Sequence, residues 1–534
     1  MCASVFTFIS SKFNLKNAIA PTLVVTGIFF LNYFFFGLEN TVIGPCIALS
    51  YLYFSKISNR MASITKTFLI YMAVAVSAWL AGMNLTLCIT INIGVFFWIA
   101  FVLIDEYHPD NYYTPGIAFL MFQLSPITGN GIVTRCTALA LSFFLAFLIM
   151  WMTSFFFRKK LVQEYVEDGL NIGRKLLNVY EAGETEQVSR LQQELRQISE
   201  TISDEIYQYN YAAFKNEHRV NWYCRFVALF QVFINLTSDE NVEEKAPIMR
   251  NMLQNFSQLL SKNMEFAERK LLTLKQNKTD LHSFRLRFAL RMVIIMIPCI
   301  IFAYLCPYGN GYWLGVSVYF MLVPLYEQSG FRIRGRVFGT LAGTLICLIL
   351  YTVFPEQGQH VIIMTIANLF INSSTSYTAT VAYLTCAVLA LNITTQNLLF
   401  TLGERLVYTV CGAFLTMIAS RYIFPIRVQP EAEHLKQKLA EIQTELAAVQ
   451  SSSQPHTEET HRQNDQLLIR SYLLGRRLRE YQQAMAEDST DLLPLMEEHM
   501  KNVSCYFTYH FTGIKATLRT DSQSSKQLQA RYTI

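Results

Sequence analysis

Charged side chains are scarce in this chain, and the sequence contains no enzyme motif that we recognise. Only 16% of the 534 residues are Asp, Glu, Lys or Arg, whereas 52% are hydrophobic. The sequence has no GxxxxGKS/T phosphate loop and no HExxH zinc motif, which argues against a nucleotide-driven pump or a metalloprotease. Gly315-Val-Ser-Val-Tyr319 lacks the closing glycine of a nucleophile elbow. We therefore predict a protein that is not an enzyme and uses no cofactor.

Metal and nucleic-acid sites are not predicted either. The eleven cysteines include no CxxC pair, so we interpret them as small apolar residues of a core. Asp105, Glu106, His108 and Asp110 form one cluster of metal-ligating residue types, but no second cluster completes a coordination shell. The net charge is only +5, and the Lys and Arg residues lie at the ends of apolar runs. A groove that binds nucleic acid would need a basic stripe.

Two long apolar blocks dominate the sequence, and each is followed by a polar helical segment. Block 1 covers residues 17–157 and block 2 covers residues 286–425. Backbone polar groups must be hydrogen-bonded inside a lipid bilayer, so each block is predicted to be a bundle of about six transmembrane helices. The predicted fold class is all-α: a polytopic membrane protein with a parallel repeat. Residues 1–16 are a predicted cytoplasmic N-terminus, and residues 158–285 and 426–534 are predicted cytoplasmic helical domains, the second with a disordered tail.

Basic residues set the predicted orientation of the blocks. Lys12 and Lys16 precede the first span, and Arg158 follows the last span of block 1. In block 2, a second span near 312–326 is followed by a predicted loop with Arg332, Arg334 and Arg336, and the third span is expected near 336–354. Because Lys and Arg accumulate on the cytoplasmic side, both chain termini are predicted to be cytoplasmic.

Four arginines occupy matching places in the two blocks. Arg60 and Arg334 are 274 residues apart, and each follows the second span of its block. Arg135 and Arg405 are 270 residues apart, at the start of the sixth span. A guanidinium at membrane depth faces protein, water or a ligand, and it can bind both oxygens of a carboxylate. We predict that these four residues bind an organic anion in the seam between the blocks, with interfacial anchoring as the alternative for Arg60 and Arg334.

Acidic and aromatic residues complete the predicted site. Glu327 and Glu404 are candidates for coupling proton movement to transport, and Glu404 is also a candidate ion partner of Arg405. Tyr312, Trp313 and Tyr326 are candidates for an aromatic pocket, with an interfacial aromatic belt as the alternative.

Helical periodicity marks the polar segments. Val188, Leu195 and Ile202 belong to one apolar seam, and Leu435 and Leu439 begin a second one. Such amphipathic helices are predicted to pack on each other or on a second copy of the chain, so a homodimer is an alternative to a monomer.

The sequence from Gly311-Tyr-Trp-Leu-Gly to Pro324, together with the following arginines and Gly339-Thr-Leu-Ala-Gly-Thr344, resembles the signature of the fusaric acid resistance and aromatic acid exporter family. Glu404-Arg405 through Arg421-Tyr-Ile-Phe-Pro425 is similar to the closing helix of that family. In block 1, Gly37-Leu-Glu-Asn40 stands where the Tyr-Trp pair is expected.

The resemblance implies a multi-pass protein of the bacterial inner membrane that exports aromatic carboxylic acids or related organic anions, in some members with a periplasmic adaptor subunit. Plant aluminium-activated malate transporters, which are anion channels, resemble one such half. The leading prediction is therefore a proton-coupled efflux transporter in the lipid bilayer. An anion channel and an envelope scaffold or regulatory membrane protein are the alternatives.

Loss of the gene is expected to make cells hypersensitive to one class of weak organic acid, because efflux would no longer lower its internal concentration. A susceptibility screen of cells with and without the gene, across aromatic acids and unrelated drugs, measures this. Equal sensitivity to every compound would contradict an export role.

Overall fold

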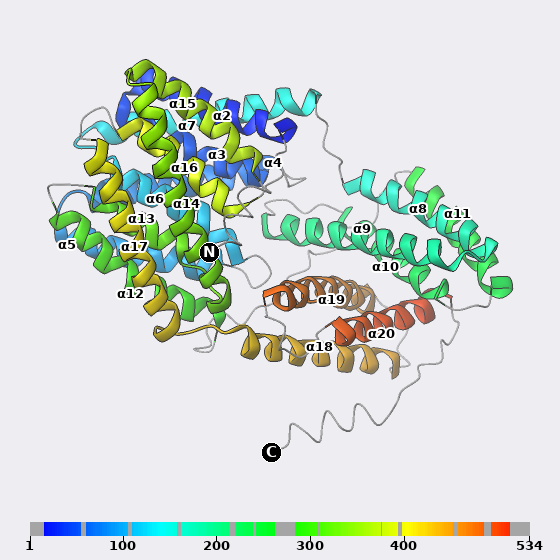
Figure 1. Ribbon diagram of the computed structural model, residues 1–534. Coiled ribbons are helices and arrows are strands. Elements are labelled where there is room, and N and C mark those ends of the chain that lie inside the picture. Colours follow the sequence, from blue (N-terminus) through cyan, green and yellow to red (C-terminus); the bar gives the residue numbers. More distant parts are fainter. Residues whose placement is uncertain are drawn as a thin grey trace. The chain divides into compact units, whose positions relative to one another are not determined.

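A computed structural model describes most of the chain, and every secondary-structure element within the described residues is a helix (Figure 1). The described residues are 15–54, 60–104, 109–156, 162–212, 219–238, 242–261, 283–306, 310–374, 376–392, 398–451, 458–484 and 493–512. The predicted disordered tail and three members of the acidic cluster, Asp105, Glu106 and His108, lie outside them.

The helices form two compact units, and each unit combines distant parts of the chain. The membrane unit comprises residues 1–159 and 275–431, and the helical unit comprises residues 160–274 and 432–534. Each unit therefore takes one portion from the first half of the chain and one from the second half.

Among its described residues, block 1 of the membrane unit has six α-helices and three short helical segments of 3₁₀ or π type. These are α2 (Leu15–Phe36), η1 (Leu38–Asn40), α3 (Ile43–Phe54), α4 (Arg60–Ala81), α5 (Leu85–Trp98), η2 (Ile99–Leu103), η3 (Pro109–Tyr112), α6 (Tyr113–Leu124) and α7 (Gly131–Phe156). Block 2 also has six helices: α12 (Phe284–Leu305), α13 (Tyr312–Met321), α14 (Tyr326–Val353), α15 (Gln357–Ser373), α16 (Tyr377–Asn392) and α17 (Leu398–Tyr422).

Seven helices of the described residues are long and apolar enough to cross a membrane. They are α2, α4, α5 continued by η2, α7, α12, α14 and α17. The helical composition and these apolar helices confirm the prediction of an all-α polytopic membrane protein.

The predicted loop with three arginines does not exist. Helix α14 begins at Tyr326, so Arg332, Arg334 and Arg336 lie within it. Pro324 ends the preceding segment, and no proline occurs between Tyr326 and Val353. Arginine is a good helix former, so these charges do not interrupt the helix. Arg332 and Arg336 are one turn apart and share a face of this long helix, and Arg334 lies on the opposite face.

Two glycines allow α14 to approach α16 closely (Figure 1). A Cβ added at Gly339 would lie 2.6 Å from the backbone oxygen of Thr378, and one at Gly343 would lie 2.5 Å from that of Ala382. This Gly-xxx-Gly spacing is the one that lets helix backbones come together in membranes.

The two blocks pack against each other through α2 with α15 and α5 with α12. The Tyr112 hydroxyl donates to the backbone oxygen of Leu322 at 2.8 Å, and the Tyr319 hydroxyl donates to that of Tyr112 at 2.9 Å. A Cβ at Gly116 would lie 1.8 Å from the Tyr319 hydroxyl oxygen. The seam between the blocks is therefore closed here by tyrosine side chains.

Arg291 holds the ends of two block 2 helices. It is fully buried on α12, and it donates from Nε to Ile423 O (3.0 Å), from Nη1 to Pro324 O (3.0 Å) and from Nη2 to Phe424 O (2.7 Å). Carbonyl groups at and just beyond the ends of helices lack intrahelical partners, and a guanidinium satisfies several of them at once. The ends of α13 and α17 are thereby fixed relative to α12.

The helical unit contains seven helices in its described residues, the first turn of α18 belonging to the membrane unit. They are α8 (Val162–Ala182), α9 (Thr185–Ala212), α10 (Arg219–Leu236), α11 (Val242–Ser261), α18 (Val428–Ser451), α19 (Glu458–Ala484) and α20 (Leu493–Thr512). Helix α9 packs on α19, and α10 packs on α20. Buried Gln231 of α10 accepts a hydrogen bond from Tyr472 of α19 and donates to Ser504 of α20. The seams of both polar segments therefore have partners within one chain, and a homodimer stays a prediction.

Replacing Gly343 with alanine is expected to destabilise the membrane unit by about 1–3 kcal/mol, because the new methyl group overlaps the α16 backbone. The matched control is Gly330→Ala on the same helix, where nothing lies within 4 Å of an added Cβ. Alanine there should be neutral or stabilising by up to about 1 kcal/mol. Thermal unfolding of both variants in detergent measures the difference, and equal midpoints would contradict the close packing.

Acidification is expected to destabilise the helical unit through His499. This side chain is buried, its Nε2 lies 3.0 Å from Ser471 Oγ, and burial lowers its pKa from 6.5 to about 4. The unfolded chain therefore binds a proton between these values, so stability is lost as the pH falls from 6.5 toward 4, by up to about 3 kcal/mol. Hydrogen exchange of residues 493–512, corrected for intrinsic rates, should rise over this range in the wild type and much less in His499→Gln. An identical rise in both proteins would exclude His499 as the cause.

Candidate functional site

Helices α13, α14 and α17 pack on one another within block 2, and two arginines are buried between them. Arg336 of α14 is 1% exposed and Arg405 of α17 is 3% exposed. Neither forms an ion pair within the described residues. Two positive charges therefore lie inside an apolar bundle with no counter-charge from the described residues.

Arg336 has no hydrogen-bond acceptor in the part of the chain that the structure describes. Its Nε, Nη1 and Nη2 atoms are all buried and all unpartnered. The guanidinium carbon lies 4.4 Å from the centre of the Phe320 ring. A ring face attracts a cation, but it leaves the in-plane N–H donors unsatisfied. Burying an unpaired charge costs several kcal/mol, so this group requires an acceptor from elsewhere.

Arg405 has similar surroundings. Its guanidinium carbon lies 4.1 Å from the centre of the Trp313 ring, and its Nε has no acceptor among the described residues. Arg336 is close enough to repel it electrostatically. Two neighbouring like charges repel each other, and a negative group between or beside them would offset this repulsion.

Polar groups of α13 and α14 line the same region. Trp313, Ser317 and Phe320 follow one another at helical spacing on α13, and Thr340 lies one turn after Arg336 on α14. Trp313 Nε1, Ser317 Oγ and Thr340 Oγ1 are buried and have no partner in the described chain. The site therefore offers N–H and O–H donors to a ligand that carries acceptors.

Helix α17 approaches α13 closely at Gly412. A Cβ at Gly412 would lie 3.2 Å from the Ser317 Cβ and 3.3 Å from the Met321 Cε. Glycine at this place brings the α17 backbone against the Ser317 face of α13. Arg405 lies two turns earlier on α17, beside Trp313.

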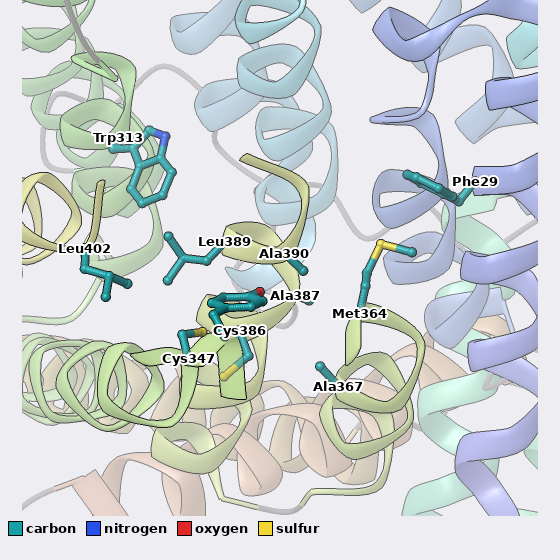
Figure 2. Close-up of a cluster of buried hydrophobic side chains, with 11 residues drawn as sticks. Phe29, Trp313, Cys347, Met364, Ala367, Cys386, Ala387, Leu389, Ala390 and Leu402 are labelled. Atoms are coloured by element: carbon teal, nitrogen blue, oxygen red, sulfur yellow. The ribbon is translucent and has the colours of Figure 1, made fainter. Parts of the chain in front are cut away.

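Apolar side chains surround the Trp313 ring. Trp313 belongs to a buried cluster with Cys347, Leu389 and Leu402, and Phe29 of block 1 packs at the other side of this cluster beside Met364 (Figure 2). The cationic site thus adjoins an apolar wall, which is the pairing that an amphipathic anion requires.

The structure brings some of the predicted residues together and separates others. Arg405 and Trp313 form part of the site, and half-buried Tyr312 is near enough to Arg405 to interact with it electrostatically. Arg334 is exposed on α14 and lies apart from the buried pair, and Arg60 begins α4 with its side chain outside the described residues.

The predicted acidic residues do not pair with the buried arginines. Glu404 is half-buried and accepts a hydrogen bond from Asn310 Nδ2 at 2.8 Å. Glu327 and Tyr326 are half-buried in the first turn of α14. No group of three His, Cys, Asp or Glu residues is placed to bind a metal among the described residues.

Arg135 is buried on α7, and its donors are already used. It donates from Nε to Asn40 Oδ1 (3.0 Å), from Nη1 to Phe122 O (3.1 Å), and from Nη2 to Ser125 O (2.7 Å) and Glu39 O (2.9 Å). Four of its five N–H groups are therefore satisfied by the protein. This arrangement ties η1 and the end of α6 to α7, and it leaves little capacity for a ligand.

Four residues of this site were not predicted from the sequence: Arg336, Ser317, Phe320 and Thr340. Arg336 was assigned to a loop with Arg334, although the two are two positions apart on a helix and point to different faces. The four-residue spacing Trp313–Ser317 was an available signal on α13, and the spacing Arg336–Thr340 becomes visible only once α14 is extended back to Tyr326.

A comparison with known proteins gives a family match within block 2. Residues 298–419 match the family model described as "Fusaric acid resistance protein-like", a segment that contains α13, α14 and both buried arginines. A curated relative, an uncharacterized protein of Haemophilus influenzae, is 25% identical over 142 residues. The matched region is 26% of this chain and 20% of that protein, so the chain covers about a fifth of the length of its relative. No solved structure matches the chain.

Proposed function

Because block 2 contains a fusaric acid resistance protein-like domain within a multi-pass membrane protein, we propose that the protein transports an organic anion and binds its carboxylate with Arg336 and Arg405. One observation supports this above all: the buried guanidinium of Arg336 has three nitrogens and no protein acceptor among the described residues. A carboxylate supplies both the missing charge and two acceptor oxygens.

The chemistry of the lining supports an anion rather than a cation or a neutral solute. Trp313 Nε1 is a donor only, and the Ser317 and Thr340 hydroxyls rotate to donate. A cation entering this space would meet two like charges. A neutral apolar solute would leave the guanidinium groups unsatisfied.

Aromatic carboxylic acids are the proposed substrate class, as in the exporter family. The carboxylate would lie between the guanidinium groups, and the ring would contact the apolar cluster around Trp313 and Leu402. We propose export across a bacterial inner membrane with both chain termini in the cytoplasm. A periplasmic adaptor subunit and a homodimer belong to the same proposal.

Proton coupling is proposed to use Glu404. It neighbours Arg405 in the sequence and is half-buried at the Asn310 end of the site. Protonation there would change the net charge near the anion. Glu327 is the second candidate. An anion channel would use the same arginines, and flux that follows voltage without dependence on a pH gradient would select that alternative.

Replacing either buried arginine with glutamine is expected to lower benzoate flux into proteoliposomes by about tenfold or more, because a charge-assisted hydrogen-bond pair is lost. Arg334→Gln is the matched control, since Arg334 lies on the same helix as Arg336 and is exposed. We expect its flux to stay within about twofold of the wild type, as for a screened surface charge.

Size-exclusion profiles and thermal midpoints of the variants must match those of the wild type, so that lost flux is not lost folding. Normal flux in Arg336→Gln and Arg405→Gln would refute the assignment. Loss of flux in Arg334→Gln alone would restore the site that the sequence analysis predicted.

A further inference from the structure

The corresponding helices of block 1 pack around a tyrosine side chain of the protein itself. Helices α3, α4 and α7 are the second, third and sixth helices of block 1, and they pack on one another as α13, α14 and α17 do in block 2. Tyr71 of α4 is fully buried between them. Its hydroxyl lies 2.7 Å from Ser50 Oγ and donates to the backbone oxygen of Cys46 at 3.1 Å. The polar end of this side chain is therefore satisfied without a ligand.

Aromatic rings pack around Tyr71. The Tyr71 ring meets Phe143 of α7 edge to face, with 5.5 Å between ring centres, and Phe68 of α4 meets the same ring at 5.4 Å. Gly412 lies seven residues after Arg405, and the residue seven positions after Arg135 is Ser142, which is buried and accepts a hydrogen bond from Asn32 Nδ2 at 2.9 Å. The polar groups on these helices of block 1 are therefore satisfied within the chain.

The buried arginines of the two blocks also differ in their hydrogen-bond acceptors. Arg135 donates to four acceptors of its own chain, whereas Arg336 donates to none among the described residues. A ligand at Arg135 would have to replace hydrogen bonds that hold η1 and α6 in place, leaving buried carbonyl oxygens unsatisfied. A ligand at Arg336 would replace no hydrogen bond to the described residues.

We infer that the two blocks are functionally unequal: block 2 binds and moves the anion, and block 1 is a closed scaffold, so that each chain has one anion site. This inference rests on the proposed function. Block 1 supports the site through α2 and α5, which pack on α15 and α12, and through Phe29, which joins the cluster that contains Trp313.

Matched cysteine substitutions test the difference. Ser50→Cys and Ser317→Cys place a thiol on the second helix of each block, at side chains that are 1% and 0% exposed. The purified full-length variants are treated in proteoliposomes with a negatively charged methanethiosulfonate reagent, with and without benzoate. Modification of each site is followed by peptide mass spectrometry, so that the native cysteines do not interfere.

We expect the thiol at position 317 to react and the thiol at position 50 to stay unmodified. Benzoate at ten times its dissociation constant should slow the reaction at position 317 about tenfold by mass action. Modification at position 317 should also block benzoate flux. Thr340→Cys provides a second block 2 site if Ser317→Cys does not fold, and native Cys46, which lies one turn before Ser50, provides a second block 1 site.

Each remaining outcome has a distinct meaning. Benzoate-protected modification in both blocks would overturn the inference and leave the proposed function intact, because the chain would then have two sites. The absence of modification in both blocks would show that block 2 is dry as well, and it would overturn the proposed function together with the inference.

Discussion

A buried positive charge with no acceptor among the described residues limits how block 2 can fold. Burial strips water from the Arg336 guanidinium, and no acceptor in the described residues replaces it. Phe320 and Trp313 lie over the two guanidinium groups and offset part of this cost through their ring faces. A carboxylate matches these unpartnered N–H donors in charge and geometry, which is why the proposed ligand is an organic anion.

The surrounding fold keeps that charge in place by close helix packing. Gly339 and Gly343 hold α14 against α16, and Gly412 brings α17 against α13. Arg291 fixes the ends of α13 and α17 by donating to their terminal carbonyl groups. Small residues and a capping guanidinium therefore hold together the three helices that carry the buried arginines and the hydroxyl groups without a partner in the described chain.

Arg135 and Arg336 are both buried, but their hydrogen-bonding surroundings differ. Arg135 ends in a nest of carbonyl and amide oxygens, and it acts as a structural tie between η1, α6 and α7. Arg336 ends beside a ring and unpartnered hydroxyl groups. What a buried guanidinium can bind therefore depends on the acceptors that the protein already provides around it.

The sequence by itself determined the class of the protein and part of its site. Long apolar runs in a bilayer must form helices, so the all-α membrane fold and the order of the helices followed from residue types. The motifs around Trp313 and Arg405 added the resemblance to a known family. The packing of the helices determines which arginines are buried and which of them have acceptors. Arg334 and Arg336 differ by two positions and about 200° around α14, so one is exposed and the other is buried, and the helix boundary that sets this angle was placed wrongly from sequence. Whether Arg135 is free or satisfied depended on oxygens contributed from Glu39 to Ser125, and contacts between residues so distant in sequence arise only when the helices pack.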